Sequence, residues 1–259
     1  MSIIRPLYPE PVLLIEGYLN QIERRFIAAS DLHIGVEYEK ALSGINLNSK
    51  LFLQRTIDRL VDLIKSTNAD GVILLGDLKS NIYTITKFEQ DNIPPILKSI
   101  SQHAEIYLIP GNHDSYIKYI APKNVYLISP SGMVLEDTLL MHGHTMPSTI
   151  RSSVKRIIMG HTHPIFFKPG SIVDGQRVWV YLKVRKEVVF PNTTGSLDII
   201  VMPSFYESPH RLSGYNKKKA ISPILRRAAK DDVIQRMLAL TLDGSIIGEI
   251  TSLQDMIQI

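Results

Sequence analysis

The feature that most constrains the fold of this chain is an alternation of short apolar runs with helix-like segments along its first two thirds. RFIAASD (25–31), GVILLGD (71–77) and EIYLIPGNHD (105–114) are mostly apolar and end in polar residues, as buried strands do where they enter a loop. Between the first two, apolar residues recur at three- and four-residue spacing and predict an amphipathic helix over 49–66. Pro94 and Pro95 precede ILKSIS, where we expect another helix to begin. Strands that alternate with helices indicate the α/β class, or α+β.

Beyond this region the chain is richer in strand-like segments. The Asp243–Gly244 pair lies between two β-prone runs and predicts a β-hairpin within 237–250. We expect a single domain over 1–259 that contains a basic, irregular insertion at 206–232, rich in Lys, Arg, Ser and Pro. The other strand-like runs are NVYLIS, GMVLE, TLLMHGH, RIIMGHTH, RVWVYLKV and LDIIVMPSF.

Composition excludes several classes of protein. No apolar run approaches the roughly 18 residues of a membrane-spanning helix, and prolines interrupt the first 20 residues, so we expect neither a membrane partner nor a signal peptide. The chain has no cysteine, which excludes disulfides and thiolate sites and makes cytoplasmic residence the default expectation. A net charge of +4 would help a polyanion approach but does not by itself indicate nucleic acid.

Polar side chains follow five of the apolar runs, and they are of one chemical kind. Since the carboxyl ends of strands in open α/β folds share one edge, we expect these groups to converge there. Carboxylates, an amide oxygen and imidazoles form the mixed N/O set that suits Mn²⁺, Fe²⁺, Zn²⁺ or Co²⁺. The residues are Asp31 and His33, Asp77, Asn112 with His113 and Asp114, His142 and His144, and His161 and His163.

Charge favours two metal ions over one. Asp31 and Asp77 supply two negative charges, so two divalent cations and one hydroxide would leave about +1, which attracts a phosphate oxygen. Metal pairs about 3.5–4 Å apart clamp the attacking and leaving oxygens of a hydrolytic displacement and lower the pKa of water to about 7.

Each motif has a structural explanation when taken singly. Gly76–Asp77 is a common chance pair in which Asp77 would be a turn residue, Asp31-Leu32-His33 alone is an equally weak signal, and GNHD (111–114) is a good turn sequence. His142 or His144 alone would more often be a hydrogen-bonded core histidine, whereas two histidines that flank one residue in GHTH are rare without a metal. The ordered set of five motifs is what favours the metal centre.

The basic and aromatic residues near the C-terminal third leave two interpretations open. They could contact a nucleic-acid backbone and its bases, or form a solvated face and ordinary packing, which we favour for the charged residues and for Phe205. The residues are Lys217, Lys218, Lys219, Arg226, Arg227 and Lys230, with Phe205, Tyr206 and Tyr215.

The motifs together resemble the calcineurin-like metallophosphoesterase superfamily. SDLHIGVEYEKALSGI, GDLKS, PGNHD, MHGHT, GHTHP and VMPSFYESPHRLSGYN narrow the resemblance to archaeal phosphoesterases related to SbcD-type repair nucleases and to bacterial DNA-ligase-associated phosphoesterases. It spans roughly residues 5 to 250. It implies a four-layer sandwich of two mixed β-sheets flanked by helices. One departure is Ser80, because related sequences generally have His, Asp or Asn three residues after the Gly-Asp aspartate.

The resemblance also implies a role for each motif residue. Asp31, His33 and His163 would hold one metal, Asn112, His142 and His161 the other, and Asp77 would bridge them. His113 would stabilise the transition state or protonate the leaving oxygen. Asp114 would orient His113, and His144 would lie behind the ligands.

The implied activity is hydrolysis of a phosphate ester by a metal-bridging hydroxide, with two divalent ions, Mn²⁺ favoured and Fe, Zn, Co or Ni as alternatives. A phosphodiester is favoured over a monoester, either a nucleic-acid end or a 2′,3′-cyclic nucleotide. Two other functions stay open: a catalytically silent binding scaffold of the same fold, and a compact DNA nuclease of a repair complex. SIIGEI and DMIQI would suit a homo-oligomer edge or terminal strand packing equally well.

Overall fold

A six-stranded sheet forms one half of the molecule. The computed structural model describes residues 2–44, 48–148, 151–207, 222–230, 233–249 and 257–258. The strand order is β1-β2-β3-β4-β5-β6; β1 to β3 pair antiparallel, and β3 to β6 pair parallel. The strands are β1 Ile3–Pro6, β2 Leu13–Leu19, β3 Ile22–Ala29, β4 Gly71–Leu75, β5 Glu105–Ile109 and β6 Val125–Leu127.

A seven-stranded mixed sheet, in the order β14-β13-β11-β12-β9-β8-β7, forms the other half. β8, β9 and β12 are parallel to one another, while the flanking pairs are antiparallel. The strands are β7 Met133–Leu135, β8 Thr138–Met141, β9 Arg156–Met159, β11 Val178–Arg185, β12 Ser196–Val201, β13 Ile234–Thr241 and β14 Ile246–Glu249, and a separate pair joins β10 Ile165–Phe166 to β15 Ile257–Gln258.

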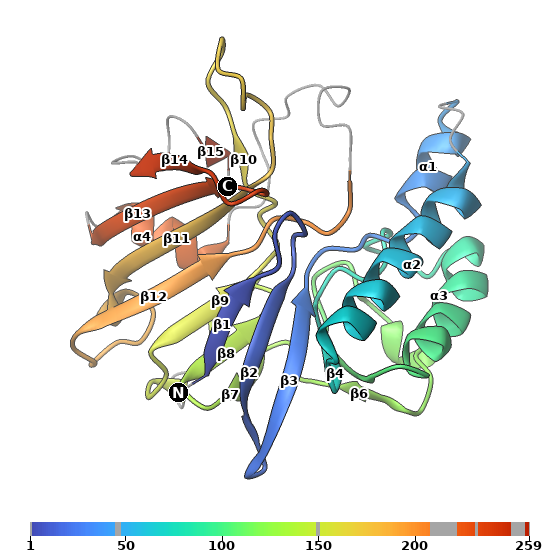
Figure 1. Cartoon of the computed structure of the whole chain (residues 1–259), viewed down its shortest axis with the longest axis horizontal. Helices are drawn as coiled ribbons and strands as arrows, with labels where there is room; N and C mark the ends of the chain where they lie inside the picture. Colours follow the sequence, from blue (N-terminus) through green and yellow to red (C-terminus); the bar gives the residue numbers. More distant parts are fainter. Residues whose placement is uncertain are drawn as a thin grey trace.

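Helices cover the outer faces of both sheets and complete four layers (Figure 1). α1 (Val36–Leu42), α2 (Ser49–Thr67) and α3 (Lys87–Ile100) lie beside the six-stranded sheet, and α4 (Pro223–Lys230) lies beyond the seven-stranded one. Three apolar clusters fill the spaces between the four layers. The expected sandwich of two mixed sheets flanked by helices is therefore confirmed, as are the helix over 49–66 and the hairpin at Asp243–Gly244.

α3 corrects the expected helix start. It begins at Lys87, not after Pro95, because Thr86 caps it: the Thr86 side chain accepts from the Glu89 backbone N–H and the Glu89 carboxylate accepts from the Thr86 N–H. Pro94 and Pro95 lie inside the helix. The free energy gained by burying the apolar face of the helix against the sheet outweighs the loss of the backbone hydrogen bonds that two prolines cannot donate.

We expected the segment 206–232 to be irregular, but part of it is helical. Its residues 223–230 form α4, and Ile224, Leu225 and Ala228 are buried in the outer cluster of the seven-stranded sheet because their spacing puts them on one helix face. Arg226 and Arg227 are exposed, while Lys217, Lys218, Lys219 and Tyr215 lie outside the described residues. In the described part of the chain, no helix has both the length and the apolar character to cross a membrane.

Candidate metal centre

The five polar motifs meet where strand ends from the two sheets face one another. Asp31 and His33 follow β3, Asp77 follows β4, and Asn112, His113 and Asp114 follow β5. From the other sheet, His142 and His144 follow β8, and His161 and His163 follow β9. The ten residues singled out in the sequence thus lie in loops that interact with one another across the two sheets.

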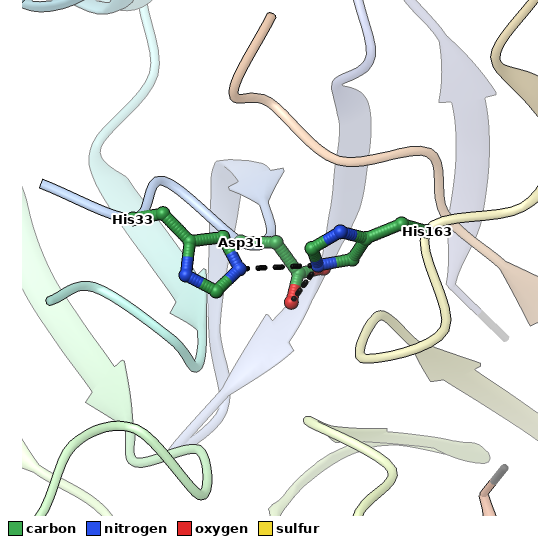
Figure 2. A group of neighbouring side chains, drawn as sticks. All are labelled: Asp31, His33 and His163. Carbon is green, nitrogen blue, oxygen red and sulfur yellow. Dashed lines mark hydrogen bonds and ion pairs between the residues drawn. The ribbon is translucent and has the colours of Figure 1, made fainter. Parts of the chain in front are cut away.

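Asp31, His33 and His163 form the first group of ligand atoms (Figure 2). The Nε2 atoms of His33 and His163 are 3.2 Å apart, and His163 Nε2 lies 3.1 Å from Asp31 Oδ1. Each of the three residues presents one nitrogen or oxygen to the same space, with all three atoms within 4.8 Å of one another.

Asp77, His142 and His161 form a second group, with their ligand atoms also within 4.8 Å of one another. His142 Nε2 lies 3.3 Å from Asp77 Oδ2 and 3.2 Å from Asn112 Oδ1, so the Asn112 amide joins this group. Asp77 Oδ2 is also 3.9 Å from His33 Nε2. Asp77 therefore lies between the two groups.

The protonation state of two histidines, His33 and His161, suits metal binding. The Nδ1 of His142 donates to the Leu75 carbonyl oxygen at 2.8 Å, which directs Nε2 towards Asp77. Burial, reinforced by the charge of His163, lowers the pKa of His33 to about 3, and burial with the charge of His142 lowers the pKa of His161 to about 4. Neutral imidazoles are the form that binds metals.

The two carboxylates carry negative charge into a buried space. Burial alone would raise the pKa of Asp31, but the charge and hydrogen bond of His163 outweigh burial and lower this pKa to about 2. Burial would likewise raise the pKa of Asp77, but the hydrogen bond and charge of His142 lower it well below its usual range. Asp31 and Asp77 are 0% and 2% exposed. Among the described residues, their ion-pair partners are all histidines.

A buried charge requires compensation, and neutral histidines supply none. Burial opposes protonation of His142, but hydrogen bonding to Asp77 and the charges of both carboxylates raise its pKa to about 9, so a protonated His142 offsets part of the carboxylate charge. Divalent cations would balance the remainder, and the oxygen and imidazole donors are those that transition metals bind. The residues present therefore fit a pair of divalent metal ions.

His113 lies beside the ligands and is held by backbone groups. Its N–H donates to Asp77 Oδ1 at 2.9 Å, its ring Nδ1 contacts the Ser80 carbonyl oxygen, and its Nε2 lies 3.8 Å from Asp77 Oδ2. Because a carbonyl oxygen only accepts, Nδ1 carries the proton and Nε2 faces the centre. Support for His113 thus comes from the main-chain carbonyl oxygen of Ser80. A residue of any type at position 80 would provide this oxygen.

The Asp114 carboxylate, expected to orient the His113 ring, binds backbone N–H groups instead. It accepts from the backbone N–H of Gly111 at 2.8 Å and from that of Lys79 at 3.2 Å, which ties the loops after β4 and β5 together. Burial and then the Asp77 charge raise the pKa of Asp114 to about 6. Asp114 therefore positions the loop that carries His113, whereas the ring itself is oriented by Ser80.

The backbone of the centre is strained where the ligands attach. Asp31, His33, Asp77, His161 and His163 all have positive φ, from 45° to 71°. Residues other than glycine rarely adopt this region, and such strain clusters at functional sites. Five of the candidate ligands share this conformation. Ordinary turns do not require so many residues other than glycine to adopt it.

Two glycines allow the loops to approach the ligands. A Cβ on Gly111 would lie 2.2 Å from Asp77 Oδ1, and a Cβ on Gly160 would lie 2.5 Å from Asp31 Oδ2. From the sequence, these glycines were recognised only as parts of the motifs GNHD and GHTH, without a structural role. The Leu75 and Ser80 carbonyl oxygens were also missed. They carry no signal in the sequence because every residue has one.

Phe205 and Tyr206 are 1% and 7% exposed, so packing is their role and base stacking is excluded for both side chains. Phe205 belongs to the cluster between the helices and the six-stranded sheet, as favoured from the sequence. Trp179 is fully buried between the two sheets.

Comparisons with known proteins agree with this architecture. The model of the calcineurin-like phosphoesterase family matches residues 24–165, which include every motif named above except VMPSFYESPHRLSGYN. The structure of nuclease MPE from Pseudomonas putida has a TM-score of 0.54 and 17% identity over 94% of this chain and 98% of that one, which shows a shared fold. YfcE, a phosphoesterase from E. coli, is more distant, with a TM-score of 0.38 and 16% identity over 87% and 98% of the two chains. No curated protein sequence matches the chain.

Proposed function

We infer the function from the premise that this chain belongs to the calcineurin-like phosphoesterase family. We propose that it hydrolyses phosphodiesters of nucleotide or nucleic-acid origin with two divalent metal ions, Mn²⁺ in the first place. The observation that carries the proposal is the convergence of buried carboxylates and imidazoles into two adjoining groups that share the space around Asp77.

Asp31, His33 and His163 would hold one ion, Asn112, His142 and His161 the other, and Asp77 would contact both. When bound, the ions would lower the pKa of a water molecule and neutralise phosphoryl oxygens. The protein's own contribution is to hold these ligands in place: the Leu75 carbonyl oxygen orients the His142 ring, and the backbone N–H of His161 donates to Asp31 Oδ2 at 3.1 Å.

His113 would act on the leaving oxygen. Its side chain is 23% exposed, the most accessible of the histidines whose ion pairs with Asp77 are described, so a substrate can reach it. With Nδ1 donating to Ser80, a protonated ring presents Nε2–H to the space beside Asp77 and can donate a proton to an alkoxide there. Asp114 would position this loop, and His144, whose Nδ1 is buried, would lie behind His142.

The experiment compares hydrolysis of bis(p-nitrophenyl) phosphate and p-nitrophenyl phosphate with and without Mn²⁺. We expect Mn²⁺-dependent turnover with the diester preferred. His113→Ala should lower kcat by about 100-fold or more, because general acid catalysis contributes about that much, while elemental analysis shows unchanged metal content. His103→Ala is the matched control, since His103 is an exposed histidine in the turn that follows α3.

The competing function is a binding scaffold of the same fold without catalysis. All seven candidate ligand positions are filled, which favours the enzyme. Protein that contains metal but turns over neither ester would support the scaffold and contradict our proposal.

A further inference from the structure

Two exposed tyrosines and a lysine follow the His113 loop directly. The Tyr116 and Tyr119 rings have centroids 6.2 Å apart at 24°, so they stack, and the Lys118 ammonium lies 5.0 Å from the centroid of the Tyr119 ring. The tyrosines are 57% and 70% exposed. We call Tyr116, Lys118 and Tyr119 the tyrosine platform.

The backbone of Tyr116 is strained although its side chain is exposed. Its φ is 65° and its ψ 5°, in the left-handed region, where a bulky side chain is a genuine outlier and Asn or Gly is usual. Burial could offset such a cost, but more than half of this side chain is in solvent. Strain that burial does not offset occurs mainly at functional sites.

The platform is fixed close to the candidate metal centre. The Ile117 N–H donates to the Asp114 carbonyl oxygen at 3.1 Å, and the Asp114 carboxylate holds Gly111 and Lys79. Tyr116 is three residues from His113, so their Cα atoms are separated by at most about 11 Å. A strand whose phosphodiester lies beside His113 can therefore place a neighbouring base on the platform.

We propose that the tyrosine platform stacks unpaired bases of a nucleic-acid strand whose phosphodiester lies at the metal centre, a substrate assignment that rests on the proposed function. Aromatic side chains that present their faces to solvent bind bases without regard to sequence, and a nearby cation attracts the backbone. Phe205 and Tyr206 are too buried to do this. Bases in a duplex are already stacked on one another, so the platform selects a single strand.

Binding is measured first without catalysis. The full chain in EDTA at low salt is titrated into a fluorescein-labelled oligothymidylate, and fluorescence anisotropy gives Kd. Tyr116→Ala and Tyr119→Ala should each raise Kd by about 5- to 100-fold, whereas Tyr116→Phe should leave it unchanged because stacking needs the ring and not the hydroxyl.

Two controls separate stacking from folding. Tyr18→Ala should not change Kd, because Tyr18 is a comparably exposed tyrosine (53%) that pairs with Glu23 at the opposite end of β3 from Asp31. Tyr116→Asn should raise Kd as Tyr116→Ala does while its Tm stays at or above that of the wild type, since Asn tolerates the left-handed backbone.

Catalysis then distinguishes this proposal from the proposed function. With Mn²⁺, the platform variants should raise KM for the oligonucleotide and leave bis(p-nitrophenyl) phosphate hydrolysis unchanged. Equal Kd for wild type and Tyr116→Ala, or equal binding of strand and duplex, overturns the platform even if the small diester is hydrolysed. Binding that depends on the platform in a protein that hydrolyses no ester upholds the platform and overturns only the proposed function.

Discussion

At the scale of the residue, Gly160 shows how little space the centre leaves. A Cβ at this position would lie 1.6 Å from the Ser30 hydroxyl oxygen as well as 2.5 Å from Asp31 Oδ2. Ser30 itself donates to Asp31 Oδ2, so the glycine, the hydroxyl and the carboxylate fit only together. The loop that carries His161 and His163 can reach Asp31 only because residue 160 has no side chain.

Gly160→Ala should therefore displace this loop and lose both metal content, by elemental analysis, and diester hydrolysis. Gly170→Ala is the control, because no atom lies within 4 Å of its Cβ. It should keep both properties and lose only about 1 kcal/mol of stability through its left-handed backbone. Normal metal content in Gly160→Ala would show that the loop reaches the centre by another path.

At the scale of the element, the first turn of α3 supports the loop after β4, whose Ser80 carbonyl oxygen contacts His113. The buried Glu89 carboxylate caps the helix and also accepts from the backbone N–H of Ser80 at 3.0 Å and of Asn81 at 2.8 Å. One carboxylate thus joins the start of a helix to the residue whose carbonyl orients His113. A cap that serves only helix stability would not contact this loop.

Glu89→Ala should lower the free energy of unfolding by about 3 kcal/mol, because several buried N–H donors would lose a charged acceptor. It should also lower kcat without loss of metal, since His113 loses its support and the ligands do not. Gln90→Ala, at the exposed neighbouring position, should change neither. Chemical denaturation and diester kinetics on the wild type, Glu89→Ala and Gln90→Ala provide the measurement. An unchanged kcat in Glu89→Ala would show that α3 does not support the position of His113.

At the scale of the whole molecule, the centre joins two sheets that are otherwise held by an apolar core. Of the seven candidate ligands, four come from loops of the six-stranded sheet and three from loops of the seven-stranded sheet, so ions bound between them would hold the halves together. Dialysis against EDTA should lower Tm, and Mn²⁺ at about 100 times its Kd should restore about 2.7 kcal/mol, or roughly 5–10 °C. Differential scanning calorimetry provides the test, and a Tm indifferent to EDTA and Mn²⁺ would contradict a metal bridge.

The metal-free protein should be most stable near pH 6.5. Burial lowers the pKa of His33 to about 3 and of His144 and His161 to about 4, so the unfolded chain binds more protons and stability falls as the pH drops from 6.5 towards 4. Asp114 and Glu37, whose pKa values burial raises, oppose this fall, but they are two groups against three. Despite burial, the carboxylates raise the pKa of His142 to about 9, so its stabilisation is present below pH 6.5 and is lost as the pH rises through 9.

Circular dichroism melts of EDTA-treated protein across this range provide the measurement. His144→Gln should weaken the fall on the acid side, because it removes one of the three buried imidazoles without removing a proposed ligand. A Tm that rises steadily from pH 4 to 9 would show that the charge of His142 does not stabilise the fold.

The sequence alone determined the apolar runs that become strands, the amphipathic α2, the Asp243–Gly244 hairpin and the ten polar residues of the centre, because these depend on local periodicity and on side-chain chemistry. The start of α3 was also encoded locally, in Thr86 and Glu89, but the prolines concealed it. Tertiary structure decided the rest: Trp179 and α4 are buried by packing between distant segments, and the Leu75 and Ser80 carbonyl oxygens, which every residue possesses, acquire roles only when a histidine from another strand is brought to them.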